Sequence, residues 1–198
     1  LIGDHFTNSN VIKKLPGDSA IGHNRYSTTG ETSLRNIQPF FADLHSGGLS
    51  IAHNGNLTNA IKLRETLVKE GAIFRTTSDT ETIVQLIAKS SREKFIDKLI
   101  DSLFQIQGGY SLVLMTNKKL VGERDPFGIR PLVIGKLKNS YVLARALTVL
   151  AIDITGVSVG LMLAIARETC SALLAREAAT TTLVGTAIVL FLSSFRLT

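Results

Sequence analysis

The sequence predicts a layered α+β domain, because amphipathic helices stand beside a series of short strands. Apolar residues recurring every three or four positions predict helices at 57–70 and 93–105, and a capping pattern predicts a further helix that starts at Ser78. At 198 residues the chain is long enough for one well-buried domain. Short strand-like runs bounded by turn residues are expected at 19–25, 49–53, 110–116, 119–123, 131–135 and 140–144. The last four of these runs suggest an antiparallel meander.

The boundaries of the helices follow from local sequence. Gly71 stands where a glycine commonly ends a helix, directly after the 57–70 pattern. Ser78 and Glu81 have the spacing of a capping box, in which each side chain satisfies a free backbone donor of the other residue. The third helix is expected to bury one apolar face, formed by Phe95, Ile96, Leu99, Ile100, Leu103 and Phe104.

Charge and cysteine content narrow the function classes. The formal net charge is +6, but the lysines are scattered through amphipathic patterns, so we expect a solvated surface and no nucleic-acid partner. Cys170 is the only cysteine, so this segment alone can build no intrachain disulfide and no cysteine-based metal cluster. We expect a reducing, cytoplasmic location. Neither a signal sequence nor an initiator methionine is visible, which suggests a fragment whose start lies upstream.

The composition changes near residue 145. Every lysine lies at or before Lys138, whereas residues 145–198 use only arginine for positive charge and are rich in small and apolar residues. Residues 147–166 have about the length of a membrane-spanning helix, although Asp153 interrupts them. This tail is therefore open to three interpretations: an out-of-frame or misjoined translation, a packed pair of apolar helices, or a membrane anchor.

A polar loop is expected at 22–31, after the first strand, and it contains Arg25. An arginine beside small hydroxyl residues and a glycine is suited to a bidentate pair with a carboxylate while the loop closes. A surface or structural ion pair is the alternative for Arg25.

A second polar cluster, at 53–59, reads His-Asn-Gly-Asn-Leu-Thr-Asn. Asn54 can supply a side-chain N–H and Gly55 an unobstructed backbone N–H, which are the donors that an oxyanion hole requires. A hairpin turn is the alternative, because Asn-Gly is also the commonest hairpin sequence.

Asp79 falls in the first turn of the second helix, where the helix dipole favours a carboxylate whether or not it has a function. It could equally present a fixed negative charge to a substrate ammonium. A cation, an anion and a pair of N–H donors together match a zwitterionic amino acid with a reactive side-chain carbonyl. Glutamine is such a molecule.

Four motifs, in this order, resemble the class II glutamine amidotransferase domain of the amidophosphoribosyltransferase family. They are Arg-Tyr-Ser-Thr-Thr-Gly at 25–30, the cluster at 53–59, Thr-Thr-Ser-Asp at 76–79, and Arg-Asp-Pro-Phe-Gly-Ile-Arg-Pro-Leu at 124–132. The resemblance covers residues 1–144. It implies an enzyme that hydrolyses glutamine and transfers the ammonia to phosphoribosyl pyrophosphate, giving phosphoribosylamine in the first step of de novo purine biosynthesis.

The resemblance also implies roles for individual residues. Arg25 would bind the α-carboxylate of glutamine and Asp79 its α-ammonium, with Tyr26 and Thr28 as supporting contacts in the closing loop. Asn54 and Gly55 would form the oxyanion hole. The nucleophile of the family is an N-terminal cysteine whose own α-amine handles protons, and Leu1 occupies the terminus here. Cys170 cannot replace it, because its nitrogen lies in a peptide bond.

For the fold, the resemblance implies the four-layer αββα sandwich of N-terminal-nucleophile hydrolases. We expect it to be incomplete here, with residues 1–144 as the amidotransferase domain and 145–198 as a divergent tail. The implied partners are glutamine, an ammonia-accepting phosphoribosyltransferase domain absent from this segment, and further copies in a homo-oligomer. No metal or cofactor is expected in this segment. The full-length family implies Mg²⁺ and leaves an iron–sulfur cluster open.

Without the nucleophile, this chain alone is expected to bind glutamine at most. The alternative is a non-catalytic module, glutamine-binding or membrane-tethered, that keeps the binding groups.

Overall fold

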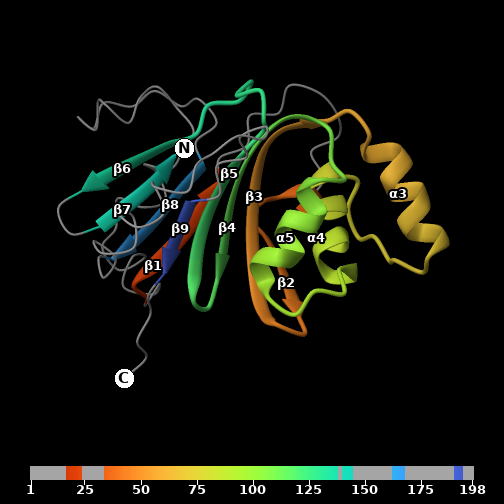
Figure 1. Cartoon of the computed structure of the whole chain (residues 1–198), viewed down its shortest axis with the longest axis horizontal. Helices are drawn as coiled ribbons and strands as arrows, with labels where there is room; N and C mark the ends of the chain where they lie inside the picture. The colour runs from red at the N-terminus through yellow and green to blue at the C-terminus, as the bar shows by residue number, and fades with distance from the viewer. Residues whose placement is uncertain (1–16, 24–33, 138–139, 145–161, 168–189, 194–198) are drawn as a thin grey trace.

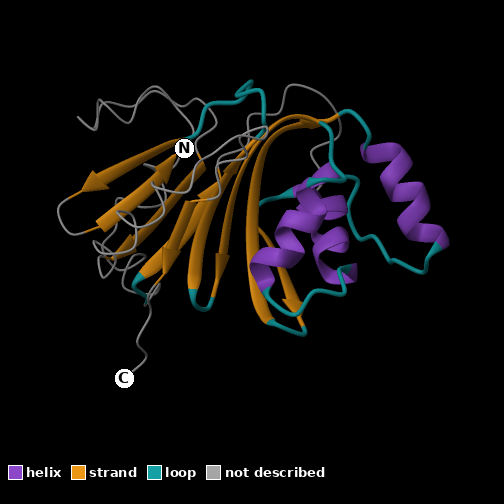
Figure 2. Cartoon of the chain, viewed as in Figure 1, coloured by secondary structure: helices purple, strands orange, loops and turns teal. Residues whose placement is uncertain are grey.

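A computed structural model of the chain describes residues 17–23, 34–137, 140–144, 162–167 and 190–193. These residues form helices and antiparallel sheets, which confirms the α+β class (Figure 2). In chain order, the elements are β1 (Ser19–His23), a 3-10 turn η1 (Leu34–Asn36), β2 (Phe40–Leu44), β3 (Gly47–Leu57), α3 (Ala60–Lys69), α4 (Asp79–Lys89), α5 (Phe95–Leu103), β4 (Gly108–Thr116), β5 (Lys119–Arg124), β6 (Val133–Leu137), β7 (Ser140–Ala144), β8 (Met162–Arg167) and β9 (Leu190–Ser193).

The strands form two sheets. One sheet has the order β2-β3-β4-β5-β9 and the other has the order β1-β8-β7-β6, with antiparallel pairing throughout. Figure 1 shows the helices on one side of the five-stranded sheet and the four-stranded sheet on its other side. The described residues therefore form three layers, with the five-stranded sheet in the middle.

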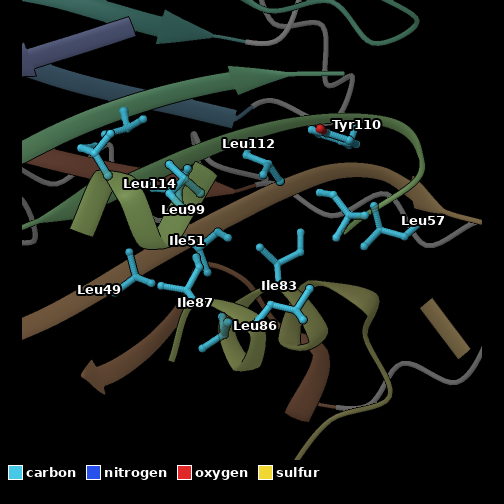
Figure 3. Close-up of a cluster of buried hydrophobic side chains, with 14 of the residues drawn as sticks. Leu49, Ile51, Leu57, Ile83, Leu86, Ile87, Leu99, Tyr110, Leu112 and Leu114 are labelled. Carbon is cyan, nitrogen blue, oxygen red and sulfur yellow. The ribbon is translucent and has the colours of Figure 1, made fainter. Parts of the chain in front are cut away.

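The larger hydrophobic cluster lies between the five-stranded sheet and the helices (Figure 3). Leu49 and Ile51 of β3 and Leu112 and Leu114 of β4 contribute from the sheet, and all four are fully buried. Each buried side chain of this size stabilises the fold by roughly 1.5 to 3 kcal/mol. From the helices, the cluster includes Leu67, Ile83, Leu86, Ile87, Ile96 and Leu99.

A second cluster joins the two sheets. Ala52 and Val113 alternate in sequence with the helix-facing residues and so point to the opposite face. There they pack with Leu143 of the four-stranded sheet. Because both faces of the five-stranded sheet are covered, its strand β4 carries a continuous apolar run, Leu112 to Met115, and not a strict alternation.

The predicted helices are confirmed with shifted ends. α3 begins at Ala60 and not at residue 57, since β3 continues to Leu57. Gly71 has φ +94°, which fits the glycine expected just after this helix. α5 buries Ile96 and Leu99, but Phe104 is 86% exposed, so its assignment to the buried face was wrong. Phe104 follows the last turn, where the chain leaves the helix.

The capping-box prediction was half right. Ser78 caps α4, and its side chain accepts a hydrogen bond from the N–H of Thr80. Glu81 does not reach back to Ser78. Its carboxylate accepts instead from the backbone N–H groups of Arg75 and Thr76, which fixes the loop that leads into the helix.

The predicted meander divides between the two sheets. β4 pairs with β5 in one sheet, and β6 pairs with β7 in the other. The chain crosses between the sheets at 125–132, where buried Asp125 accepts from the backbone N–H groups of Phe127, Ile129 and Arg130. Gly128, at φ +66°, completes this bend in a conformation that favours glycine.

Two parts of the tail are strands. β8 lies between β1 and β7, and β9 lies beside β5, so each joins a sheet built from residues before 145. The helical interpretation of 147–166 was therefore wrong for its last five residues, which pair in β8; the others lie outside the described residues. Among the described residues, no helix is long and apolar enough to cross a membrane.

Candidate functional site

The cluster at 53–59 does not begin where a strand ends. β3 runs on through Asn54, Gly55 and Asn56, and these residues stay in register with β4, where Gly55 lies opposite Tyr110. A hairpin turn at Asn54 and Gly55 is thereby excluded. Asn54 and Gly55 are both partly exposed, so a ligand can reach them.

Gly55 is required by the close approach of β4. Its φ is +148°, and a Cβ atom at this position would lie 2.2 Å from the carbonyl oxygen of Gly109. A side chain at Gly108 would clash in the same way, because a Cβ atom there would lie 2.3 Å from the carbonyl oxygen of Asn56. The two glycine-containing segments therefore fit together only without side chains, and they fix the backbone next to Asn54.

Asp79 lies at the start of α4 and turns its carboxylate toward β3. Its Oδ2 accepts the backbone N–H of Leu57 at 3.0 Å, and its Oδ1 lies 3.4 Å from Nδ1 of His53. The carboxylate therefore bridges the two residues that flank 54–56. Asp79 keeps a side-chain exposure of 20%, so its carboxylate stays accessible to a ligand.

The electrostatic setting keeps Asp79 ionised. Burial raises the pKa of its carboxyl, but the hydrogen bond and charge of His53 and the N–H groups of Leu57 and Thr80 outweigh burial, and the pKa is lowered overall. A carboxylate has about four lone-pair sites. Asp79 can thus receive another donor, such as an ammonium group, while it stays bound to β3.

Sequence reasoning missed a polar network around His53, next to Asp79. Nδ1 of His53 lies 3.1 Å from Oγ1 of Thr80, and Gln38 accepts the backbone N–H of His53 at 2.7 Å. Gln38 also donates to Oγ1 of Thr80 at 3.2 Å. Strand alternation could have revealed it, because Leu49, Ile51 and His53 share a buried face on which a polar residue needs partners.

The other predicted residues are not brought to this edge by the described part of the structure. β1 ends at His23, and Arg25, Tyr26 and Thr28 lie outside the described residues. Cys170 does as well. The structure thus joins Asp79 to the segment that contains Asn54 and Gly55.

A carboxyl group on β5 is also buried. Glu123 is fully buried, and neither carboxylate oxygen has a hydrogen-bond partner within the described ranges. It lies opposite Leu112 and so shares the helix-facing side of the sheet. Burial raises its pKa to about 8. Across the described ranges, no three His, Cys, Asp or Glu residues gather as a metal site would require.

Residues 23–151 match a family model described as a glutamine amidotransferase domain. The chain is 49% identical over 156 residues to an amidophosphoribosyltransferase of Rhizobium etli, covering 79% of this chain and 31% of the relative. It is 48% identical over 142 residues to the chloroplastic amidophosphoribosyltransferase 2 of Arabidopsis thaliana, covering 72% and 25%. The chain thus spans no more than about a third of these relatives, at 31% and 25% of their lengths.

Two solved structures are also similar to this chain. A structure described as the allosteric regulatory enzyme of purine biosynthesis matches with a TM-score of 0.65 and 34% identity, over 86% of this chain and 32% of that chain. The glutamine phosphoribosylpyrophosphate amidotransferase from B. subtilis, complexed with ADP and GMP, matches with a TM-score of 0.54 and 32% identity, over 68% and 25%.

Proposed function

The chain belongs to the glutamine amidotransferase domain family, and from this membership we propose that it binds glutamine at the edge formed by 54–57 and Asp79. Asp79 receives the α-ammonium group of glutamine. Asn54 and Gly55 donate N–H groups to the side-chain carbonyl oxygen. The bond between Asp79 and Leu57 supports this proposal most directly, because it joins the anion to the strand that carries Asn54 and Gly55.

The proposal assigns the α-carboxylate of glutamine to Arg25, with Tyr26 and Thr28 as supporting contacts. An arginine binds a carboxylate through two parallel charge-assisted hydrogen bonds, which select both charge and orientation. The α-carboxylate of glutamine would then contact a cation, its α-ammonium an anion, and its side-chain carbonyl oxygen a pair of N–H donors.

Hydrolysis of the glutamine amide places negative charge on the carbonyl oxygen. Asn54 and Gly55 would stabilise that charge with donors that are oriented before the reaction. Each such donor contributes on the order of 3 kcal/mol to the transition state in enzymes where one was removed. The single cysteine, Cys170, has its nitrogen in a peptide bond, so for this chain itself we propose binding and not turnover.

For the whole protein we propose the activity after which its relatives are named. Glutamine is hydrolysed, and the ammonia is transferred to phosphoribosyl pyrophosphate to give phosphoribosylamine, the first step of de novo purine biosynthesis. A phosphoribosyltransferase domain accepts the ammonia. A homo-oligomer in the cytoplasm, with Mg²⁺ at the acceptor domain, belongs to the same proposal.

We also propose that the three described layers belong to a four-layer αββα sandwich of the N-terminal-nucleophile hydrolase type. The five-stranded sheet with α3 to α5 would form two of these layers, and the four-stranded sheet would form the third. The packing of Leu143 against Val113 supports this arrangement, because it joins the sheets face to face.

Calorimetric titration of the 198-residue chain with L-glutamine tests the binding proposal. Arg25→Ala and Asp79→Ala should each weaken binding by roughly 2 kcal/mol or more. L-glutamate serves as the control ligand, since it lacks the amide. Unchanged affinity in both variants would show that glutamine binds elsewhere, and no binding by the unsubstituted chain would reject the proposal.

A further inference from the structure

His53 is buried on a face of β3 that is otherwise apolar. Its exposure is 4%, and its neighbours on this face are Leu49 and Ile51, both fully buried. A polar ring in such a place costs free energy unless its nitrogen atoms have partners. The ring must therefore gain its interactions from the elements packed above β3.

The Nδ1 side of the ring has such partners, and the Nε2 side has none within the described residues. Nδ1 lies 3.1 Å from Oγ1 of Thr80 and 3.4 Å from Oδ1 of Asp79. Nε2 is buried and has no hydrogen-bond partner in the described part of the chain. The position of the ring is thus set from the Nδ1 side, by the first turn of α4.

The backbone around His53 is fixed by the same network. Gln38 uses its oxygen to accept the N–H of His53 and its nitrogen to donate to Thr80. This use of both ends of the amide determines its orientation. Ser78, the cap of α4, also donates to Oγ1 of Thr80 at 3.1 Å. Thr80 is therefore the point at which the helix start, the ring and Gln38 meet.

A proton on Nδ1 is favoured by this arrangement. A bare nitrogen lone pair would face the Asp79 carboxylate and repel it, whereas an Nδ1–H group attracts the carboxylate. Among the described residues, His53 is the ionisable group that faces Asp79. Leu57 holds the other carboxylate oxygen through its backbone N–H.

We propose that His53 is a positioning residue of the glutamine site, which holds the Asp79 carboxylate against β3 in the orientation that receives the substrate ammonium. The inference rests on the function proposed above. It goes further by assigning the position of Oδ1 of Asp79 to the Nδ1 side of the ring, while Leu57 holds Oδ2.

The test compares substitutions that keep or remove a donor at the position of Nδ1. In His53→Asn, the short amide can place an N–H near that position, whereas in His53→Gln the longer amide reaches toward Nε2. His53→Leu removes both. His45→Leu is the matched control, because His45 is exposed in the turn between β2 and β3.

Two quantities are measured on the 198-residue chain: the Kd for L-glutamine by calorimetry, and the titration of the Asp79 carboxyl by carbon NMR. His53→Asn should keep the Kd within about threefold, while His53→Gln and His53→Leu should raise it by about tenfold or more. The Asp79 pKa should rise in the Gln and Leu variants and stay low in the Asn variant. His45→Leu should change neither quantity.

Thr80 gives an independent comparison if a His53 variant does not fold. Thr80→Val keeps the shape and removes the hydroxyl, so it should raise the Kd and the Asp79 pKa, whereas Thr80→Ser should restore both. An Asp79 titration that is the same in all variants, or an Asn variant as weak as the Leu variant, would overturn the inference. If the unsubstituted chain binds no glutamine, the proposed function fails, and the Asp79 titration still decides whether His53 positions the carboxylate.

Discussion

The carboxylate of Asp79 accepts the backbone N–H of Leu57 at 3.0 Å, and this bond joins the first turn of α4 to the last residue of β3. The two residues are 22 positions apart in the sequence. The bond fixes the start of α4 against the strand that carries Asn54 and Gly55. Asp79 therefore stabilises the fold at the edge where we propose that glutamine binds.

Asp79→Asn is expected to lower the free energy of unfolding at pH 7 by about 1 to 2 kcal/mol, because one neutral amide oxygen cannot replace two charged acceptors. Urea denaturation measures this change. Asp97→Asn is the control, since Asp97 is an exposed carboxylate in the first turn of α5. An equal loss in both variants would assign the effect to the helix dipole.

The same carboxylate predicts sensitivity to acid. Its pKa in the folded chain lies below the usual value of 3.8, so the unfolded chain binds the proton more readily. The stability from Asp79 is therefore fully present above that usual value and is lost as the pH falls through the folded pKa. Urea midpoints between pH 5 and 2 should fall less steeply in Asp79→Asn than in the unsubstituted chain. Parallel curves would contradict this prediction.

For Glu123 we expect the opposite dependence of stability on pH. Its pKa is raised by burial from 4.5 to about 8, so the folded chain holds a proton that the unfolded chain releases. Stability should decrease as the pH rises from about 4.5 to about 8, by roughly 2 kcal/mol or more. In Glu123→Gln this decrease should disappear from the urea midpoints, whereas exposed Glu65→Gln should retain it.

Local pattern was sufficient to predict the elements that carry the site. Apolar spacing predicted α3 and α5, the capping pattern at Ser78 predicted α4, and Leu49 to His53 were recognised as a strand. β2 was not predicted, because its five residues follow Pro39 without a clear alternation. The division of the strands between two sheets could not be predicted either, since each hairpin has the same local sequence pattern whichever sheet it joins.

The sequence predicted which residues belong to the site, but not the hydrogen bonds that connect them. Asn54, Gly55 and Asp79 were identified from their residue types. The bonds that connect them depend on contacts between distant positions, such as Gln38 with His53 and Asp79 with Leu57. These contacts arise only when α4 packs on β3, so no spacing within one motif reveals them.

Substitution of Asp125 is expected to destabilise the segment where the chain crosses between the sheets. Its carboxylate accepts three backbone N–H groups in a place that is 1% exposed. Asp125→Asn should lower the free energy of unfolding by about 2 kcal/mol or more, because an amide offers one accepting oxygen and leaves buried donors unpaired. Exposed Asp43→Asn in β2 should cost little in the same urea measurement. A small effect at Asp125 would show that water replaces its bonds.

Gly55→Ala should be among the most damaging single substitutions in β3. The new Cβ would lie 2.2 Å from the carbonyl oxygen of Gly109, and the backbone would have to keep φ +148°. Gly71→Ala separates the two causes, because Gly71 also has positive φ but nothing lies within 4 Å of its Cβ. We expect about 1 kcal/mol of lost stability at Gly71 and more than about 3 kcal/mol at Gly55. Urea denaturation of both variants measures the difference, which is the cost of separating β3 from β4. Equal losses would mean that the strands can move apart without cost, and Gly55 would then owe its place to conformation alone.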